Sequence, residues 1–277
     1  MRKCSPTLGK LTIIIALSVV PGVAHAGISG FGDFSNFTVN KSLSDSGPSP
    51  NIFPGKIELT DNAGLETRSI FYNVPQSIST FTASFTYQEV NGNSPSSQFV
   101  TQGATFILQN TSAGAQAVAA GSGAFGFQEL GGLTETRSAG LSLELDNPTA
   151  TTLYTQAAVT RGGANATSPV NLLSGDAINV SLSYNGSTLH ETLTDSITSA
   201  TASFSYLINL PQLLGGTNAY VGFGAQTPSA SSGFVPDQQY FSDFQFNAVP
   251  EPASLVLLLI GMSFLVANQC LRRRWKR

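Results

Sequence analysis

The chain has 277 residues, of which 10% are charged, and its formal net charge is −3. The charges are unevenly distributed, because residues 27–249 hold five cations and fifteen carboxylates while arginines and lysines gather at both ends of the chain. An acidic body without a basic stripe cannot release the counterions of a phosphate backbone, which excludes nucleic acid as a partner.

The first 26 residues form a predicted signal peptide. A cationic start precedes an apolar run over residues 11–20, and Ala24-His25-Ala26 offers the small residues that a signal peptidase reads. The apolar run is shorter than the ~20 residues that span a bilayer, which favours cleavage after Ala26 over an uncleaved anchor. We therefore expect an exported protein whose mature chain begins at Gly27.

Residues 27–247 have the composition and periodicity of one β-rich domain. Gly, Ser, Thr and Asn are frequent, and both cysteines, Cys4 and Cys270, lie outside this segment, so it has no disulfide and no thiolate metal site. Period-two alternation of apolar and polar residues, as over residues 80–87, indicates half-buried strands. Strands are predicted near residues 69–74, 80–88, 104–110, 140–146, 155–161, 177–184, 187–194, 201–208, 218–224 and 239–247.

Short connections join the predicted strands. Asn185-Gly186 lies between two of them and predicts a hairpin with a type I′ turn, which needs two residues that tolerate positive φ. Residues 111–123, 211–216 and 225–236 are predicted loops, the first of them rich in Ala, Gly and Ser. About ten strands with no helix before residue 253 favour an all-β fold, a two-sheet antiparallel β-sandwich or jelly roll.

The order of these segments is similar to that of a known family. The segments in question are residues 68–72, 81–85, 103–110 (Gly-Ala-Thr-Phe-Ile-Leu-Gln-Asn), 141–146 (Leu-Ser-Leu-Glu-Leu-Asp), 178–186 and 218–223, which together span most of residues 30–247. They resemble the L-type, or legume-like, lectins. The resemblance implies a concanavalin-like jelly roll that binds a glycan or exopolysaccharide through Ca2+ and a transition metal such as Mn2+.

Glu144 and Asp146 are the candidate metal ligands. They lie two apart on a predicted strand, so their carboxylates project from the same face and could share a hard cation. In the lectins that the chain resembles, this Glu-x-Asp pair binds metal together with an Asn, a second Asp and a His. Residues 147–156 offer Asn147 and little else. Two alternatives therefore remain open, a weak calcium site and a solvated acidic pair at a strand end.

Gln102, Gly121, Gly123, Phe125 and Asn147 are the candidate carbohydrate-binding residues. In the lectins that the chain resembles, an Asp that bonds two sugar hydroxyls stands directly before the glycine of the Gly-x-x-Phe strand. This chain has Gln102 there, which can bond hydroxyls but lacks the charge that strengthens such bonds. The resemblance also implies that a backbone amide of the Gly121-to-Gly123 loop and the face of Phe125 meet a sugar ring. Packing of Phe125 in the core is the alternative.

The residues do not point to an enzyme. Glu144-Leu145-Asp146 begins the Glu-x-Asp-x-x-Glu signature of glucanases with a similar jelly roll, but Thr149 stands where the second Glu is required. Retaining hydrolysis needs two carboxyl groups about 5 Å apart, so the signature is incomplete. His190 alternates with its neighbours in a predicted hairpin strand, which predicts an exposed strand position rather than a general base.

The end of the chain combines three features in order. Pro250-Glu251-Pro252 is followed by an apolar segment over residues 253–271, long enough for a membrane helix, and by an arginine-rich cluster over residues 272–277 that favours a cytoplasmic end. This arrangement resembles the PEP-CTERM sorting signal of Gram-negative bacteria. The resemblance implies anchoring in the inner membrane, recognition by an exosortase-type processing enzyme, and transfer to the cell surface or extracellular matrix. A simple membrane anchor is the alternative.

The sequence therefore predicts three parts: a signal peptide (1–26), a legume-lectin-like domain (27–247) and a sorting signal (248–277). The predicted function is that of an exported, surface-sorted protein with a carbohydrate-binding domain. The alternative is a structural protein of the extracellular matrix whose lectin fold has lost sugar and metal binding, which Gln102 and the residues after Asp146 favour.

Overall fold

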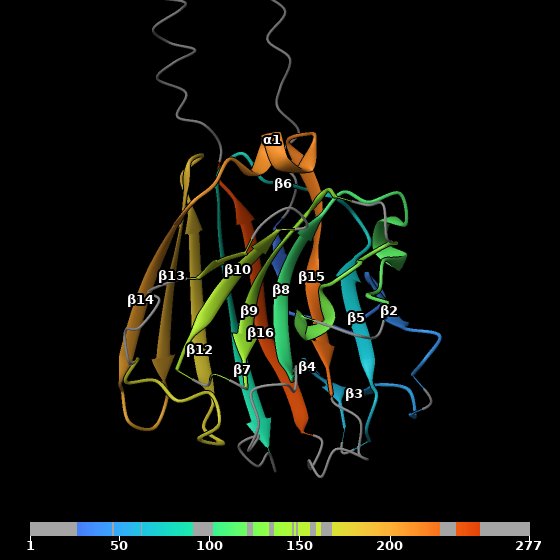
Figure 1. Cartoon of the computed structure of the whole chain (residues 1–277), viewed down its shortest axis with the longest axis vertical. Helices are drawn as coiled ribbons and strands as arrows, with labels where there is room; N and C mark the ends of the chain where they lie inside the picture. The colour runs from blue at the N-terminus through green and yellow to red at the C-terminus, as the bar shows by residue number, and fades with distance from the viewer. Residues whose placement is uncertain are drawn as a thin grey trace, which may run out of the picture.

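The computed structural model describes residues 27–45, 47–61, 63–90, 102–120, 124–132, 136–145, 147, 149–155, 159–161, 168–227 and 237–249. These residues form two antiparallel sheets that pack face to face (Figure 1). The predicted all-β sandwich is therefore confirmed. The predicted signal peptide, the membrane helix and the sorting residues Pro250, Glu251 and Pro252 lie outside the described ranges. Within those ranges, no helix has the length and apolar character needed to span a membrane.

Sheet 1 has the strand order β14-β13-β12-β7-β16-β4-β3, and β1 pairs with β16. Its strands are β1 (Ile28–Ser29), β3 (Asn51–Phe53), β4 (Lys56–Thr60), β7 (Phe81–Val90), β12 (Ile178–Tyr184), β13 (Thr188–Asp195), β14 (Thr201–Leu207) and β16 (Gln238–Ala248). The order places β7 between β12 and β16, so segments far apart in the sequence lie side by side at the centre of the sheet.

Sheet 2 has the strand order β11-β10-β9-β8-β15-β5-β2, and β6 pairs with β15. Its strands are β2 (Phe37–Lys41), β5 (Thr67–Tyr72), β6 (Gln76–Ser77), β8 (Gly103–Gln109), β9 (Ser138–Glu144), β10 (Thr151–Thr155), β11 (Val159–Arg161) and β15 (Asn218–Gln226). Three short helical segments complete the description: α1 (Leu210–Leu214) and the 3-10 turns η1 (Gly114–Gln116) and η2 (Ala124–Gly126).

Nine of the ten predicted strands occur close to their predicted positions, and one prediction is wrong. The strand predicted at residues 155–161 is two antiparallel strands, β10 and β11, in which Thr152 pairs with Arg161. The short strands β1, β2, β3, β4 and β6 were not predicted, and α1 occupies a segment predicted as a loop. Asn209 caps α1 by accepting a hydrogen bond from the Gln212 amide, and Gly215 ends it in a left-handed conformation.

The predicted hairpin at Asn185-Gly186 is confirmed, but the predicted type I′ turn is wrong, because Gly186 has a positive φ while its neighbours Asn185 and Ser187 do not. Tyr184 pairs with Leu189, and the Asn185 N–H donates to the Thr188 carbonyl. Asn185 is therefore the first residue of the turn, and its side chain accepts hydrogen bonds from the Ser187 and Thr188 amides. The positive φ of 99° falls on Gly186, the residue that adopts it without a steric penalty.

The core between the sheets is built on aromatic side chains. Every second residue of β7 is buried, so that Phe85 and Tyr87 point toward sheet 2. Phe223 of sheet 2 stacks on Phe241 of sheet 1 with ring centroids 4.3 Å apart, and meets Phe85 edge-on at 4.9 Å. Interlocked rings of this kind bury large apolar areas and fix the spacing of the two sheets.

A second, smaller core covers the outer face of sheet 2. Phe127 and Leu130 pack with Ala117 against Phe71 and Ile107, whose side chains leave the sheet on the side away from sheet 1. The strands β8 and β9 are consequently buried on both faces, with no exposed residue along either. The described part of the predicted loop at 111–123 is thus a packed platform on the sheet.

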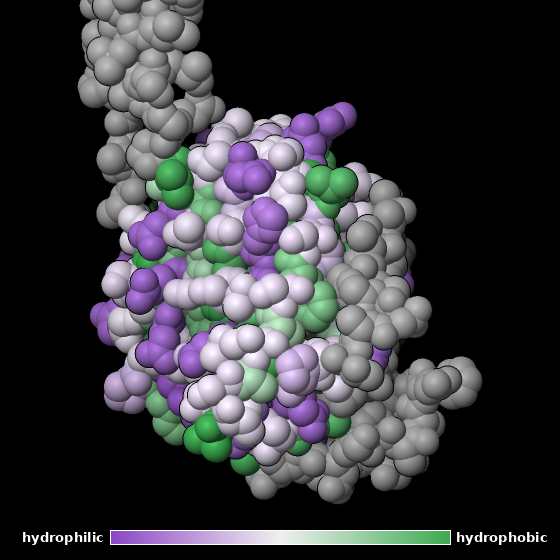
Figure 2. Space-filling model, turned by 90° about the vertical axis from the view of Figure 1, so that its left-hand side faces the viewer, coloured by the Kyte–Doolittle hydropathy of each residue, from purple (hydrophilic) through white to green (hydrophobic). Residues whose placement is uncertain are grey.

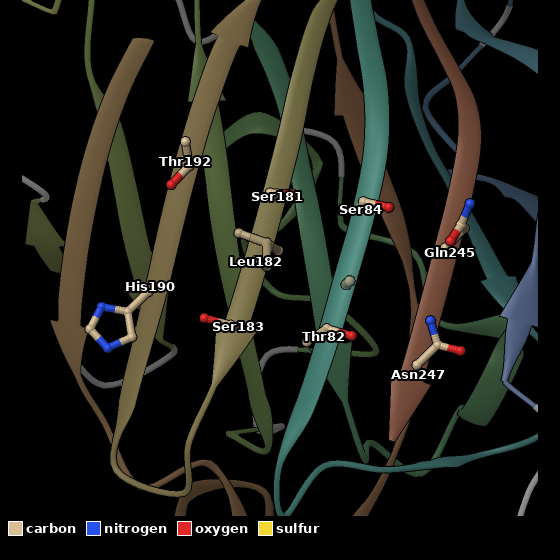
Figure 3. Close-up of a pocket in the computed structure, with 10 residues that line it drawn as sticks. Thr82, Ser84, Ser181, Leu182, Ser183, His190, Thr192, Gln245 and Asn247 are labelled. Carbon is tan, nitrogen blue, oxygen red and sulfur yellow. The ribbon is translucent and has the colours of Figure 1, made fainter. Parts of the chain in front are cut away.

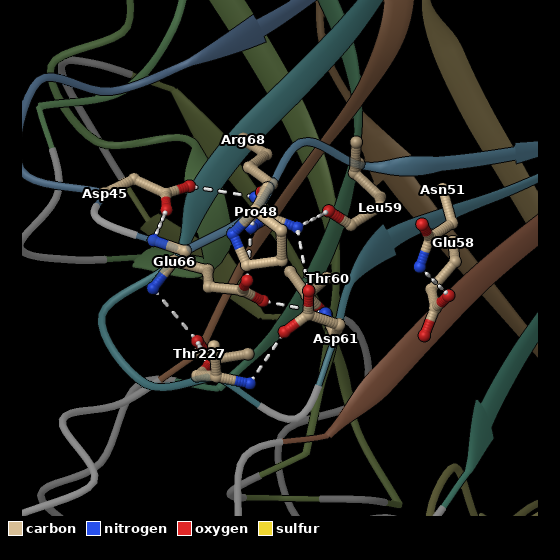
Figure 4. Close-up of polar contacts among 12 residues, drawn as sticks. Asp45, Pro48, Asn51, Glu58, Leu59, Thr60, Asp61, Glu66, Arg68 and Thr227 are labelled. Atoms are coloured by element: carbon tan, nitrogen blue, oxygen red, sulfur yellow. Dashed lines mark hydrogen bonds and ion pairs between the residues drawn. The ribbon is translucent and has the colours of Figure 1, made fainter.

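Arg68 on β5 ties the loop before β3 to the sandwich (Figure 4). Its buried guanidinium donates to Asp45 Oδ2 at 2.9 Å, to the Leu59 carbonyl at 3.2 Å and to the Glu66 carboxylate. Because a buried charge is tolerated only when it is paired and hydrogen-bonded, these contacts must form together. Arg68 therefore links residues from three separate segments into one rigid corner.

The first and last described residues meet at one end of the sandwich, here called the tail pole. Ile28 of β1 pairs with Phe246 of β16, and the Val249 N–H donates to the Thr80 carbonyl at 2.9 Å. The helix α1 caps the same end, at the top of Figure 1. The two segments that flank the domain thus leave it from neighbouring points.

The opposite end, here called the site pole, is where β7 and β9 end and β8 and β16 begin. Gly103 at the start of β8 pairs with Glu144 on one side and Gln226 on the other. Gln239 Nε2 of sheet 1 donates to the Gln226 carbonyl of sheet 2 at 3.2 Å, so both sheets meet at this end. Gln102 and Glu144 therefore lie at the pole opposite Val249.

Candidate functional site

Glu144 lies at the end of β9, on the face of sheet 2 that the outer layer covers. Only 2% of its surface is exposed, and the Tyr154 hydroxyl of β10 donates to its Oε1 at 3.1 Å. The alternative of a solvated acidic pair is therefore wrong for Glu144, because segments distant in sequence pack over the end of this strand. Its predicted partner Asp146 lies outside the described residues.

Phe125 is part of the outer layer and packs close to Glu144. Its ring centroid lies 6.0 Å from that of Tyr154, and its carbonyl accepts a hydrogen bond from Thr105 Oγ1 at 2.9 Å. Phe125 has a left-handed backbone with φ of 57° and is 2% exposed. The packing alternative is confirmed for this residue, because so little of the ring reaches the surface.

Gln102 directly precedes β8 and is 1% exposed. Its carbonyl accepts the Leu145 N–H at 2.9 Å, which fixes the backbone, but neither its side-chain oxygen nor its nitrogen has a hydrogen-bond partner among the described residues. The next residue must be glycine, since a Cβ at Gly103 would lie 2.3 Å from the Leu143 carbonyl oxygen and 3.0 Å from the Phe125 ring. The Gln102 side chain is thus buried next to a backbone position that allows no Cβ.

The other predicted carbohydrate-binding residues are only partly described. Asn147 is half-buried, and its carbonyl accepts the Ala150 N–H at 2.8 Å, which closes a turn between β9 and β10. Gly121 and Gly123 lie outside the described residues. Among the described candidates, the fold brings Gln102, Phe125 and Glu144 to one place, with Tyr154 between Phe125 and Glu144.

The described residues do not by themselves fit the two cations that the resemblance implies. No group of three or more His, Cys, Asp or Glu side chains that could hold a metal ion occurs within the described ranges. Calcium takes six to eight oxygen ligands, whereas the described site offers the Glu144 carboxylate, which already accepts a hydrogen bond from Tyr154.

Unpartnered buried polar groups gather at the site pole. Besides the amide of Gln102, the Thr67 hydroxyl and both carboxylate oxygens of Asp237 have no hydrogen-bond partner in the described structure. Thr67 pairs with Gln226, and Asp237 directly precedes β16, whose Gln239 contacts Gln226. Each buried group without a partner costs about 1–3 kcal/mol, so this concentration marks a region where a ligand or water could supply the missing bonds.

Comparison with known proteins identifies the fold. Neither a family profile nor a curated protein matches the chain, whereas solved structures do. Arcelin-5, a lectin-like defense protein from Phaseolus vulgaris, aligns with a TM-score of 0.57 at 12% identity, over 82% of this chain and 99% of its own. This chain has the legume-lectin fold. The metal-free form of lectin I-B4 from Griffonia simplicifolia also aligns with this chain, with a TM-score of 0.55 at 14% identity. The alignment covers 80% of this chain and 99% of the lectin.

A third structure of the legume-lectin fold, the basic winged bean lectin with Tn-antigen, has a TM-score of 0.55 at 14% identity and covers 82% of this chain and 100% of its own. The likeness therefore extends over nearly the whole of the solved domains. At such low identity it concerns the fold, and the legume-lectin-like architecture predicted from the sequence is confirmed at that level.

Sequence reasoning missed Tyr154, because the predicted strand began one residue later. The run of β-branched and aromatic residues in Thr-Thr-Leu-Tyr-Thr over 151–155 carries the signal that could have found it. The predicted exposed strand position of His190 is confirmed: it faces solvent on β13, where its Nδ1 shares a hydrogen bond of 2.9 Å with Ser205 Oγ.

Proposed function

We propose that this protein is an exported carbohydrate-binding protein whose combining site lies at the site pole, around the start of β8 and the end of β9. The observation that carries the proposal is the buried, unpartnered amide of Gln102 in a legume-lectin fold. An amide has two donors and an acceptor, and sugar hydroxyls both donate and accept, so the two are chemically matched. Leaving such a group buried without a partner is unfavourable unless a ligand uses it.

The proposed binding does not depend on Ca2+ or Mn2+. Glu144 accepts a hydrogen bond from Tyr154, and no group of three or more His, Cys, Asp or Glu side chains that could hold a metal ion occurs among the described residues. The site therefore recognises sugars through neutral hydrogen bonds, and affinity is expected to be lower than that of a site in which a charged Asp replaces Gln102. We propose binding without hydrolysis.

Delivery to the cell surface is part of the proposal and rests on the sequence. The signal peptide would direct export, and the Pro250-Glu251-Pro252 tail would anchor the chain in the inner membrane until an exosortase-type enzyme removes the helix. Mass spectrometry of the protein from its native cells is expected to find neither residues 1–26 nor the C-terminal helix. An intact Arg277 in the mature protein would contradict the sorting step.

A glycan array tests the binding site. The full chain in mild detergent is expected to bind at least one glycan equally with calcium and with EDTA. Gln102→Leu, which removes the amide at similar volume, should abolish that binding. Gln116→Leu, an exposed change in the outer layer, is the matched control and should leave it intact.

The structural-matrix alternative is favoured by one observation, the deep burial of both Gln102 and Phe125, since a ligand must displace protein atoms to reach them. It predicts that the array retains no glycan under either condition. Restored sugar binding in a Gln102→Asp variant would then identify a lectin fold that has lost its activity through this position.

A further inference from the structure

The outer face of sheet 1, on the side of the molecule away from the outer layer of sheet 2, carries a depression of about 360 Å³. It crosses β13, β12, β7 and β16 (Figure 3), and its polar lining is here called the hydroxyl trough. Ala83 and Leu182 also line the depression, although their side chains are buried in the core on the other face of the sheet. The trough residues are Thr82, Ser84, Ser181, Ser183, His190, Thr192, Gln245 and Asn247.

The strand register arranges these side chains in two straight rows. One row crosses the sheet as Thr192, Ser181, Ser84 and Gln245, since each is the direct cross-strand partner of the next. The second row, two residues along the strands, is His190, Ser183, Thr82 and Asn247. With strands ~4.8 Å apart and ~3.4 Å per residue, the array measures roughly 14 Å by 7 Å, larger than one pyranose ring.

Side-chain length gives the array its hollow shape. The two central strands β12 and β7 carry only Ser and Thr, whereas longer side chains stand on the flanking strands, His190 on β13 and Gln245 and Asn247 on β16 (Figure 3). The rim on β13 is held in place, because His190 and Thr192 share hydrogen bonds with Ser205 and Ser203 of β14. The hollow therefore runs along the strands and is open to an extended chain.

The central hydroxyls of the trough are free to bind. The side-chain hydroxyls of Thr82, Ser84, Ser181 and Ser183 form no hydrogen bond with other protein groups within the described structure. Elsewhere on the same face, hydroxyl groups form hydrogen bonds across strands, as the Thr86 hydroxyl does with Asn179. The trough is thus a dense array of groups that both donate and accept, with no Asp, Glu, Lys or Arg among them.

We propose that the hydroxyl trough is a second binding surface, for an extended neutral polysaccharide chain, separate from the site pole. A charged polymer would find no opposite charge there, and a peptide strand pairs with a sheet edge rather than a sheet face. A second copy of this chain does not fit either, because two hollows facing each other would enclose a void, and protein interfaces pack closely.

The surroundings agree with a hydrophilic ligand. Figure 2 looks onto the β14 edge, where the described residues are mainly pale or purple and the hydrophobic ones are scattered among them, without a continuous apolar area. The trough has no aromatic side chain to stack on a sugar ring. Affinity for a short oligosaccharide is therefore low and rises with chain length, as one polymer engages several protein molecules.

The test measures binding of the immobilised full chain, in mild detergent, to dextran and mixed-linkage β-glucan as neutral probes and to alginate as an anionic probe. Ser181→Gln fills the floor of the trough and is expected to weaken binding of a neutral probe at least tenfold. Thr201→Gln, on the same face but on β14 outside the trough, should leave it unchanged. Gln102→Leu, at the site pole, should leave polymer binding by the trough in place.

The proposal is overturned if neutral polymers bind Ser181→Gln as well as the wild type, if alginate binds as well as the glucans, or if the chain is a dimer that Ser181→Gln separates. If Ser181→Gln alters the melting temperature, the double change Ser84→Ala with Ser181→Ala removes two hydroxyls without added bulk and is expected to weaken binding about tenfold. Loss of polymer binding in Gln102→Leu alone would refute the trough while supporting the site at the pole.

Discussion

Glu191 on β13 is a buried carboxylate whose ionisation should control stability. It points into the core, is 1% exposed, and its Oε2 accepts hydrogen bonds from Thr151 at 2.7 Å and Tyr206 at 3.1 Å. Thr151 belongs to sheet 2, so the contact joins the two sheets. Burial raises the pKa of Glu191 from 4.5 to about 7, although the two hydrogen bonds oppose the shift.

The sign of the effect follows from which state holds the proton. Between pH 4.5 and about 7 the folded chain keeps Glu191 protonated while the unfolded chain releases the proton, so stability falls as the pH rises. At 1.36 kcal/mol per pKa unit, this interval corresponds to about 3 kcal/mol. A Glu191→Gln variant cannot ionise, so relative to the wild type it should gain about 3 kcal/mol between pH 4 and pH 8.

Urea unfolding followed by circular dichroism at several pH values measures the difference. The unpartnered amide hydrogens of the new glutamine shift the free energy of unfolding by the same amount at every pH. This offset does not affect the test, because the prediction concerns how the free energy of unfolding changes with pH. Asp243→Asn, which removes an exposed carboxyl group from β16, is the control and should give a profile parallel to the wild type. Parallel profiles for Glu191→Gln and the wild type would refute the reasoning.

Three further predictions concern the core and the site pole. Arg68→Met removes the guanidinium that pairs with two buried carboxylates and should lower the free energy of unfolding by about 3–5 kcal/mol. The control Lys56→Met, at the surface, should lower it by less than about 1 kcal/mol. Equal melting temperatures for the two variants would contradict this prediction. Phe223→Ala empties the centre of the ring cluster and should cost about 3–5 kcal/mol in urea unfolding, against little change for the exposed Phe53→Ala. Burial and a neighbouring carboxylate raise the pKa of Asp237 from 3.8 to about 8, so stability is lost as the pH rises through that interval. Asp237→Asn should therefore stabilise the fold at pH 8 and not at pH 4. Stabilisation at pH 4 and not at pH 8 would exclude a protonated Asp237.

The long strands of sheet 1 were well predicted because one face of the sheet meets solvent. Along β7 and β12 buried and exposed residues alternate, which is the local pattern that a sequence displays. In sheet 2, β8 and β9 are buried on both faces, and the mainly hydrophobic run of residues 104–108 still indicated the position of β8. The short strands β3 and β6 have too few residues to show a period, and they depend on pairing with longer neighbours.

The candidate site was only partly predictable, because its character depends on contacts between distant segments. Alternation places Glu144 on the face of sheet 2 away from the core, which from the sequence reads as a solvated position. The outer layer around Phe125 and Phe127 buries it instead. The hydroxyl trough depends on the register of β13, β12, β7 and β16, segments separated by more than one hundred and fifty residues at the extremes, and no local pattern records that register.

The separation of the two poles gives the domain a direction. β7 runs the length of the sandwich, and its ten residues correspond to ~33 Å. Val249 is hydrogen-bonded to Thr80 at the tail pole. A chain attached by its last segment, whether to a bilayer or to a surface polymer, is therefore attached at the tail pole. Gln102 then lies buried near the far tip, while the rows of hydroxyls line the flank, where a polymer strand parallel to the long axis could run from the attachment surface toward the tip.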